Sequence, residues 1–183
     1  MLQLPPIPSW DALHPLIIHF PIALLLIAPV FIIVGALLQP ARGRAYLVAA
    51  MVLLLAGTAS VYLAIETGEA AGKLAERAPG VERVIETHES LAERTRTVFT
   101  VLSVIFTALL VVPRLLKKND TRLTTTILPL AFLVLYGGGA LLLVNTAHNG
   151  GRLVHEFGVR ALMTSSPPNA NITVPVSTEQ EID

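Results

Sequence analysis

Four long runs of apolar residues, separated by short polar stretches, dominate the chain. They cover residues 15–38, 45–65, 97–112 and 124–147. A helix needs about 20 residues to cross the hydrocarbon core of a bilayer, so three of these runs are long enough to span a membrane. No stretch alternates apolar and polar residues in the manner of strands, which argues against a membrane β-barrel. The pattern therefore predicts an all-α membrane protein with four transmembrane helices.

The third run is short for a bilayer, but a stripe of less polar residues extends it toward the N-terminus. The stripe recurs at helical spacing through His88, Leu91, Ala92, Thr95, Phe99 and Leu102. This spacing places its members on one helix face, so we expect the third helix to begin before residue 97. Four helices joined by short connections form an up-down-up-down bundle, which we expect to be one transmembrane domain over residues 1–163.

The C-terminal region differs from the apolar runs. Asn149, Gly150 and Gly151 accept left-handed backbone conformations, so we expect the fourth helix to stop there and a short outer amphipathic segment to follow. Residues 164–183 are polar and lack a helical period. We expect them to form a flexible, disordered external tail.

Composition supports the membrane class and narrows the chemistry. Hydrophobic residues make up 53% of the chain and charged residues 14%, and mean hydropathy is +0.66, unlike a water-soluble domain. There is no cysteine, which excludes disulfides, thiolate-held iron–sulfur clusters and covalent c-type haem attachment. No phosphate-binding glycine loop, dinucleotide fingerprint or zinc-protease helix is found. Zero net charge and the membrane location disfavour a nucleic-acid partner.

Charge is divided unevenly between the two sides of the predicted bundle. The connections after the first and third helices carry six basic residues and one acidic residue, a net charge of +5. The other side carries seven basic and twelve acidic residues, a net charge of −5. Compact basic connections lie in the cytoplasm by the positive-inside rule. We therefore expect a multi-pass protein with both termini and the segment 66–96 outside the cytoplasm.

All five histidines fall on that outer side: His14, His19, His88, His148 and His155. An unpartnered imidazole in hydrocarbon is costly, so such residues are candidate metal or haem ligands, proton carriers or helix-to-helix hydrogen bonders. His19 lies about one turn into the first span, His88 shares the stripe of the third helix, and His148 continues a line through residues 141, 144 and 145. We expect these three to point into the bundle.

Spacing limits how the histidines act together. His14 and His19 are about 140° apart around a helix, so one ion does not readily bind both. They fit one inward ligand plus a supporting or surface residue, or two ligands for two centres. Imidazoles from separate helices commonly hold haem, and a b-type haem needs only coordination and an apolar slot. We expect His19 and His88 to be the axial pair, with His14 and His148 as a second pair or supporting residues.

Two groups of small residues bear on such a slot. They are Gly57, Thr58, Ala59 and Ser60 in the second run, and Gly137, Gly138, Gly139 and Ala140 in the fourth. Small residues make room for a flat macrocycle, but they equally let membrane helices pack closely. Both interpretations stay open from sequence.

Three segments resemble a bacterial membrane family catalogued as domain of unknown function 2231. They are residues 14–24, reading HPLIIHFPIAL, the start of the third helix with His88, and residues 148–159, reading HNGGRLVHEFGV. The resemblance implies a four-helix inner-membrane protein, often encoded beside or joined to c-type cytochromes, with haem binding as an expectation. His14, His19, His88 and His148 match family positions. Where the family more often has Leu-Val-Tyr, this chain has Leu153-Val154-His155, so His155 is not carried over as a ligand.

The sequence thus leads to a functional hypothesis. We expect one or two non-covalent b-type haems near the outer face, exchanging electrons with a c-type cytochrome, quinol or a larger membrane complex. One alternative is a copper- or zinc-binding protein that uses the same imidazoles. Another is a non-redox scaffolding subunit whose histidines only form hydrogen bonds. No constellation supports hydrolase or transferase activity.

Overall fold

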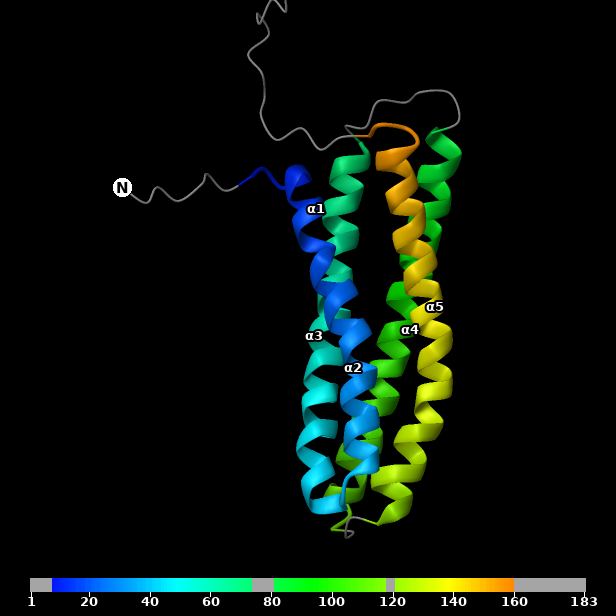
Figure 1. Ribbon diagram of the computed structural model, residues 1–183. Coiled ribbons are helices and arrows are strands. Elements are labelled where there is room, and N and C mark those ends of the chain that lie inside the picture. The colour runs from blue at the N-terminus through cyan, green and yellow to red at the C-terminus, as the bar shows by residue number, and fades with distance from the viewer. Residues whose placement is uncertain (1–7, 74–80, 118–120, 160–183) are drawn as a thin grey trace, which may run out of the picture.

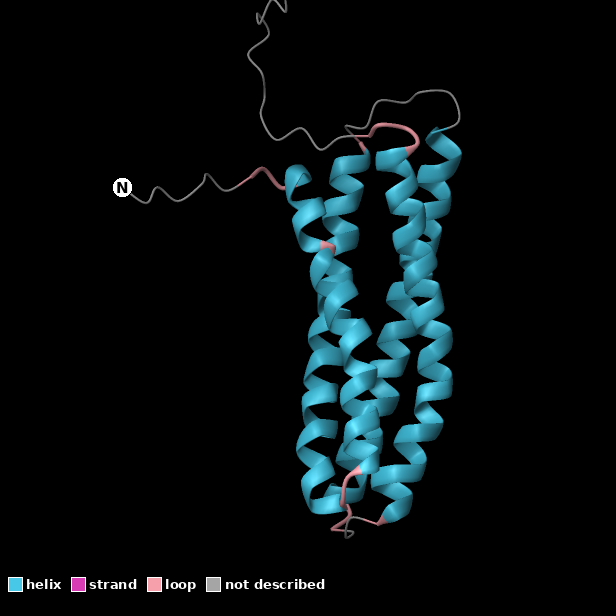
Figure 2. Ribbon diagram, viewed as in Figure 1, coloured by secondary structure: helices cyan, strands magenta, loops and turns pink. Residues whose placement is uncertain are grey.

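The computed structural model describes residues 8–73, 81–117 and 121–159, and within these ranges it is helical without strands (Figures 1 and 2). A 3-10 turn, η1, precedes the first helix, and a π-helical turn, η2, precedes the last. The elements are η1 (Asp11–Leu13), α1 (His14–Ile17), α2 (His19–Leu37), α3 (Pro40–Gly72), α4 (Val81–Leu115), η2 (Leu123–Ile127) and α5 (Leu128–His155). The predicted tail, residues 164–183, lies outside the described residues.

The helices form two antiparallel hairpins that pack side by side. The first hairpin consists of α1 and α2 with α3, and the second of α4 with α5 (Figure 1). Four segments are long and apolar enough to cross a membrane: His14–Leu37, Pro40–Gly72, Val81–Leu115 and Leu123–His155. Both ends of the described chain lie at the same end of the bundle. The predicted four-helix membrane bundle is confirmed, as is the early start of the third helix.

The outer surface of the bundle suits a lipid environment. Large apolar side chains point away from the core along every helix, and Val134 and Leu141 on α5 are 79% and 74% exposed. Without a hydrocarbon solvent, so much exposed apolar surface would be unfavourable. The protein therefore contacts the bilayer over most of its length.

The expected helix stop after the fourth span is wrong. α5 continues through Asn149, Gly150 and Gly151 to His155. Asn149 is buried and its side-chain amide donates to the carbonyl of Asn145 at 3.0 Å, one turn earlier. Local propensity for a stop is overridden because this turn packs against α4. The residues expected to form a separate outer segment begin as the last turn of α5.

A hydrogen bond joins the two hairpins beside a proline in the first, with a tyrosine of the second as the donor. Pro29 in α2 has no N–H, so the carbonyl of Leu25, four residues earlier, lacks its helical donor. The hydroxyl of Tyr136 on α5 donates to this carbonyl at 2.6 Å, and Tyr136 is only 1% exposed. A side chain of the second hairpin thus satisfies the backbone of the first. The ring of Tyr136 also packs edge-on against Phe99, with centroids 5.6 Å apart.

Two of the small residues, Gly57 and Gly139, serve close helix packing, whereas a Cβ at Gly137 or Gly138 would meet nothing within 4 Å. A Cβ at Gly57 would meet the side chain of Leu25 at 2.7 Å, and one at Gly139 would meet Leu102 at 2.9 Å. At the other end of the bundle, a Cβ at Gly43 would collide with the carbonyl oxygen of Gly35. The contacts at Gly57 and Gly139 match the packing interpretation of these residues.

We expect Tyr136→Phe to lower the free energy of unfolding by about 1–3 kcal/mol, because it leaves the Leu25 carbonyl without a donor in a buried position. Thermal unfolding in detergent, followed by circular dichroism, measures this loss. Tyr46→Phe is the control, since that side chain is exposed and its loss of a hydroxyl costs little. Equal stability of the two variants would contradict the role assigned to Tyr136.

Candidate two-imidazole site

His14 is fixed by a helix of its own hairpin. Its Nδ1 lies 3.0 Å from the carbonyl oxygen of Ala64 and 3.2 Å from the hydroxyl of Thr67, both on α3. A carbonyl only accepts hydrogen bonds, so Nδ1 is the donor and carries a proton. The Thr67 hydroxyl itself donates to the carbonyls of Leu63 and Ala64, which leaves its oxygen as a second acceptor for His14.

His88 is held in the same manner in the second hairpin. Its Nδ1 lies 2.9 Å from the carbonyl oxygen of Thr146 on α5, so this nitrogen also donates. Thr146 is buried, and its hydroxyl pairs with that of Thr95 on α4 at 2.8 Å. The carbonyl that accepts the hydrogen bond from His88 therefore belongs to a tightly packed turn.

A glycine lies against each imidazole. A Cβ at Gly68 would meet Cε1 of His14 at 2.9 Å, and a Cβ at Gly150 would meet Cε1 of His88 at 3.0 Å. Real Cβ atoms essentially never approach as closely as the contact at Gly68, and the contact at Gly150 is tighter than nine in ten real ones, so each ring occupies space that a larger residue would need. Gly68 and Gly150 thus cradle the two rings.

The hydrogen bonds determine what the rings present to their surroundings. In a neutral imidazole with the proton on Nδ1, Nε2 carries a free lone pair. Within the described residues, neither His14 nor His88 has a hydrogen-bond partner on Nε2, and neither Nε2 is a fully enclosed atom. The two rings are close enough for a charge on one to affect the other. One imidazole from each hairpin therefore lies near the other at this end of the bundle.

The helix that carries His14, α1, packs only within its own hairpin. α1 packs against α3, and no Cα of α1 lies within 8 Å of α4 or α5, whereas α2 contacts α5 farther along the bundle. Figure 1 shows α1 beside α3 at the end of the bundle that holds both ends of the described chain. Backbone packing therefore does not join α1 to the second hairpin.

The expectation that His19 and His148 point into the bundle is wrong, because both side chains are exposed. The buried face of α2 passes through Pro21 and Leu25, and His19, two positions before Pro21, lies about 200° around the helix from it. His148 does continue the line through Leu141, but that line faces outward. Of the two histidines in the first span, His14 rather than His19 is partly buried. The sequence predicts His14 only as a second ligand or supporting residue.

Two further residues, Pro21 and His155, lie in the first and last spans. Pro21 lacks the N–H that would bond the carbonyl of Ile17, and the helix is interrupted between α1 and α2 at Ile18. His155 is exposed in the last turn of α5. The contacts at Gly68 and Gly150 involve His14 and His88 and do not include His155.

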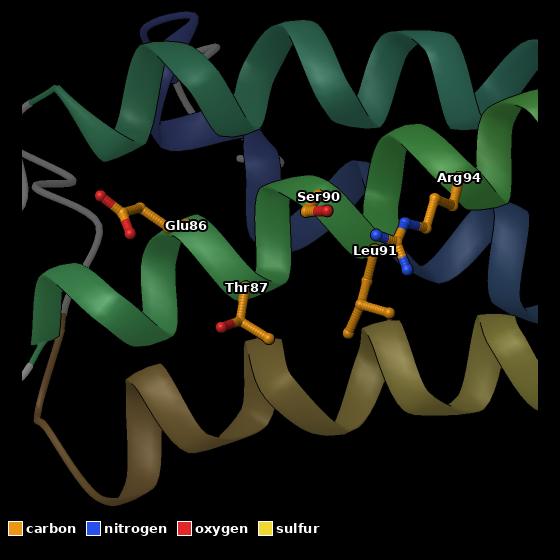
Figure 3. A pocket seen from close by; sticks show the side chains of 5 residues that line it. All are labelled: Glu86, Thr87, Ser90, Leu91 and Arg94. Atoms are coloured by element: carbon orange, nitrogen blue, oxygen red, sulfur yellow. The ribbon is translucent and has the colours of Figure 1, made fainter.

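A separate hollow of about 310 Å³ lies on the surface of α4. Figure 3 shows the side chains that line it: Glu86, Thr87, Ser90, Leu91 and Arg94. All five come from one helix, and only Leu91 among them is partly buried. The hollow contains no imidazole and is distinct from the two-imidazole site.

The arrangement of potential metal-ligating side chains is described for residues 8–73, 81–117 and 121–159. In these ranges, no three His, Cys, Asp or Glu side chains come together as a metal site. The two imidazoles therefore have no third such side chain beside them in these ranges.

One family model matches most of the chain. The model of a family described as a predicted membrane protein, DUF2231, matches residues 10–162. The chain belongs to the DUF2231 family. The match covers all four helices and both imidazoles of the site, and the family description assigns no activity. No curated protein and no solved structure matches the chain significantly.

Several residues of this DUF2231 site escaped the sequence analysis. Hydrogen bonds to the carbonyls of Ala64 and Thr146 leave no mark in side-chain identity, and Thr67 resembles an ordinary helix residue. The glycines do leave a signal. Gly57 and Gly68 are 11 positions apart, as are Gly139 and Gly150, which is about three helical turns and hence one face.

We expect Gly150→Ala to push the His88 ring away from the Thr146 carbonyl, because the new Cβ would meet Cε1 at 3.0 Å. The population of the Nδ1-protonated tautomer of His88 falls, which nitrogen NMR of the side chain measures. Gly151→Ala is the matched control, since a Cβ there meets nothing within 4 Å. An unchanged His88 tautomer in Gly150→Ala would refute the cradle.

Proposed function

We propose that the protein binds one b-type haem through the Nε2 atoms of His14 and His88. The observation that carries this proposal is the shared arrangement of the two rings. Each donates its Nδ1 proton to a helix carbonyl of its own hairpin, as histidine ligands to metals generally do. That bond orients the ring and makes Nε2 a better ligand.

The residues around the imidazoles suit such a group. Gly68 and Gly150 leave room for the two rings themselves. Non-covalent binding agrees with the absence of cysteine from the sequence. A structural zinc site takes four protein ligands and a catalytic one three, so the two imidazoles favour haem over the zinc alternative.

Bound haem supplies one-electron exchange between ferrous and ferric iron. What the chain contributes is position: it places two strong ligands at one end of the membrane, where both ends of the described chain lie. Electrons would then pass to or from a c-type cytochrome, quinol or a larger membrane complex at that face. The protein is thus an electron carrier or a subunit of such a complex.

The bacterial inner membrane, with the imidazole end facing the periplasm, is the location that we propose. The helix ends on the other side of the bundle carry Arg42, Arg44 and Arg114, as cytoplasmic ends of membrane helices do. A reporter active only in the periplasm should be active when fused after Asp183 and inactive when fused after Gln39. The reverse pattern would invert the orientation.

The ligand assignment is tested by four single variants of the purified protein. We expect His14→Ala and His88→Ala each to convert a low-spin, six-coordinate b-haem spectrum into a five-coordinate one or to abolish it. His19→Ala and His148→Ala are matched controls, because their exposed side chains leave the site intact. The measurement is the absorption spectrum of the oxidised and then the reduced protein.

Loss of the spectrum in His19→Ala, with His14→Ala unchanged, would restore His19 to the axial pair. Colourless, haem-free wild-type protein that co-purifies with a larger assembly would instead support the scaffolding alternative.

A further inference from the structure

The two hairpins repeat one another position by position. In the first helices, the buried residues Pro21, Leu25, Ala28 and Ile32 of α2 correspond to Thr95, Phe99, Leu102 and Phe106 of α4, which are also buried. Each pair is separated by 74 positions, and the same shift relates His14 to His88. The ligand histidines therefore occupy equivalent places in the two hairpins.

The second helices repeat with a different constant shift. Buried positions of α3 correspond to buried positions of η2 and α5 that lie 82 residues later. The pairs are Gly43 and Thr125, Leu47 and Pro129, Ala50 and Phe132, Leu54 and Tyr136, Gly57 and Gly139, Val61 and Leu143, and Thr67 and Asn149. The same shift relates Gly68 to Gly150, the two residues that cradle the imidazoles.

Contacts repeat along with positions. Gly57 faces Leu24 and Leu25, and Gly139 faces the equivalent residues Val98 and Phe99. The acceptor of the His14 proton, Ala64, precedes its cradle glycine by four residues, as does Thr146, the acceptor of the His88 proton. The two half-sites are thus built on one plan, and each hairpin supplies one half.

The half-sites differ in the acceptors that each imidazole has. The hydroxyl of Thr67 gives His14 a second acceptor at 3.2 Å. Its equivalent, Asn149, donates its amide to Asn145 instead, and in the described residues the His88 Nδ1 has the Thr146 carbonyl alone. Thr67 is completely buried, so its hydroxyl does not form hydrogen bonds with solvent.

We infer that the two hairpins are structural repeats that share one two-imidazole site. Within this inference, Thr67 is a positioning residue that orients His14 as the ligand from the first hairpin. The inference rests on the proposed function. His14 lies on α1, which is only four residues long and separated from α2 at Ile18, whereas His88 lies within the 35-residue helix α4. The short helix holds its imidazole less firmly by itself, and the second acceptor compensates.

The hydrogen bond also sets ligand strength. An acceptor on Nδ1–H increases the negative character of the ring, which favours ferric over ferrous iron. Removing the Thr67 acceptor should therefore make the midpoint potential of the haem more positive. Because the cradle distances at Gly68 and Gly150 nearly match, a threonine at position 149 should reach His88 and make the potential more negative.

Three variants of the full-length protein test this inference: Thr67→Val, Thr67→Ser and Asn149→Thr. Redox titration measures the midpoint potential, and NMR of the haem-free protein measures solvent exchange of the His14 Nδ1 proton. We expect Thr67→Val to shift the potential upward and to speed proton exchange several-fold. Thr67→Ser, which keeps the hydroxyl, should behave as the wild type does, and Asn149→Thr should shift the potential downward.

Equal shifts in Thr67→Val and Thr67→Ser would overturn the inference, because the effect would then follow side-chain volume rather than the acceptor. An unshifted or upward potential in Asn149→Thr would overturn the equivalence of the two half-sites. Failure of the wild type to bind haem would refute the proposed function, whereas the exchange of the His14 proton would still test Thr67.

Discussion

The donation of a ring proton to a helix carbonyl is the interaction on which the site depends. An imidazole near hydrocarbon must satisfy its polar nitrogens, and His14 and His88 each satisfy Nδ1 within their own hairpin, at Ala64 and Thr146. Because a carbonyl cannot donate, this choice leaves the other nitrogen, Nε2, with a free lone pair. The same bond that stabilises the ring in the membrane thus prepares it as a ligand.

The rest of the bundle divides the work between two levels. Farther along, the hydroxyl of Tyr136 joins the hairpins by completing the α2 backbone opposite Pro29, and Phe99 packs against its ring. Near the imidazoles, α1 has no backbone contact with the second hairpin. A group bound by both Nε2 atoms would therefore join α1 to the second hairpin, which the backbone itself does not.

Sequence predicted the class, the four spans and the early start of α4, because membrane burial requires long apolar runs and helical periodicity. It also selected His14 and His88 among the candidates. It paired His88 with His19 because depth is visible in sequence, whereas the rotation of α1 and α2 against α3 is not. It ended α5 at Asn149 because local propensity carries no information about packing on α4. The Gly57–Gly68 and Gly139–Gly150 spacing held the missing signal.

Titration of the purified, haem-free protein with haem tests the central claim most directly. Two equivalent nitrogens facing one region predict saturation at one haem per chain, with the low-spin spectrum of bis-imidazole coordination. The absence of saturable binding, or saturation at two haems per chain, would contradict a single site shared by His14 and His88.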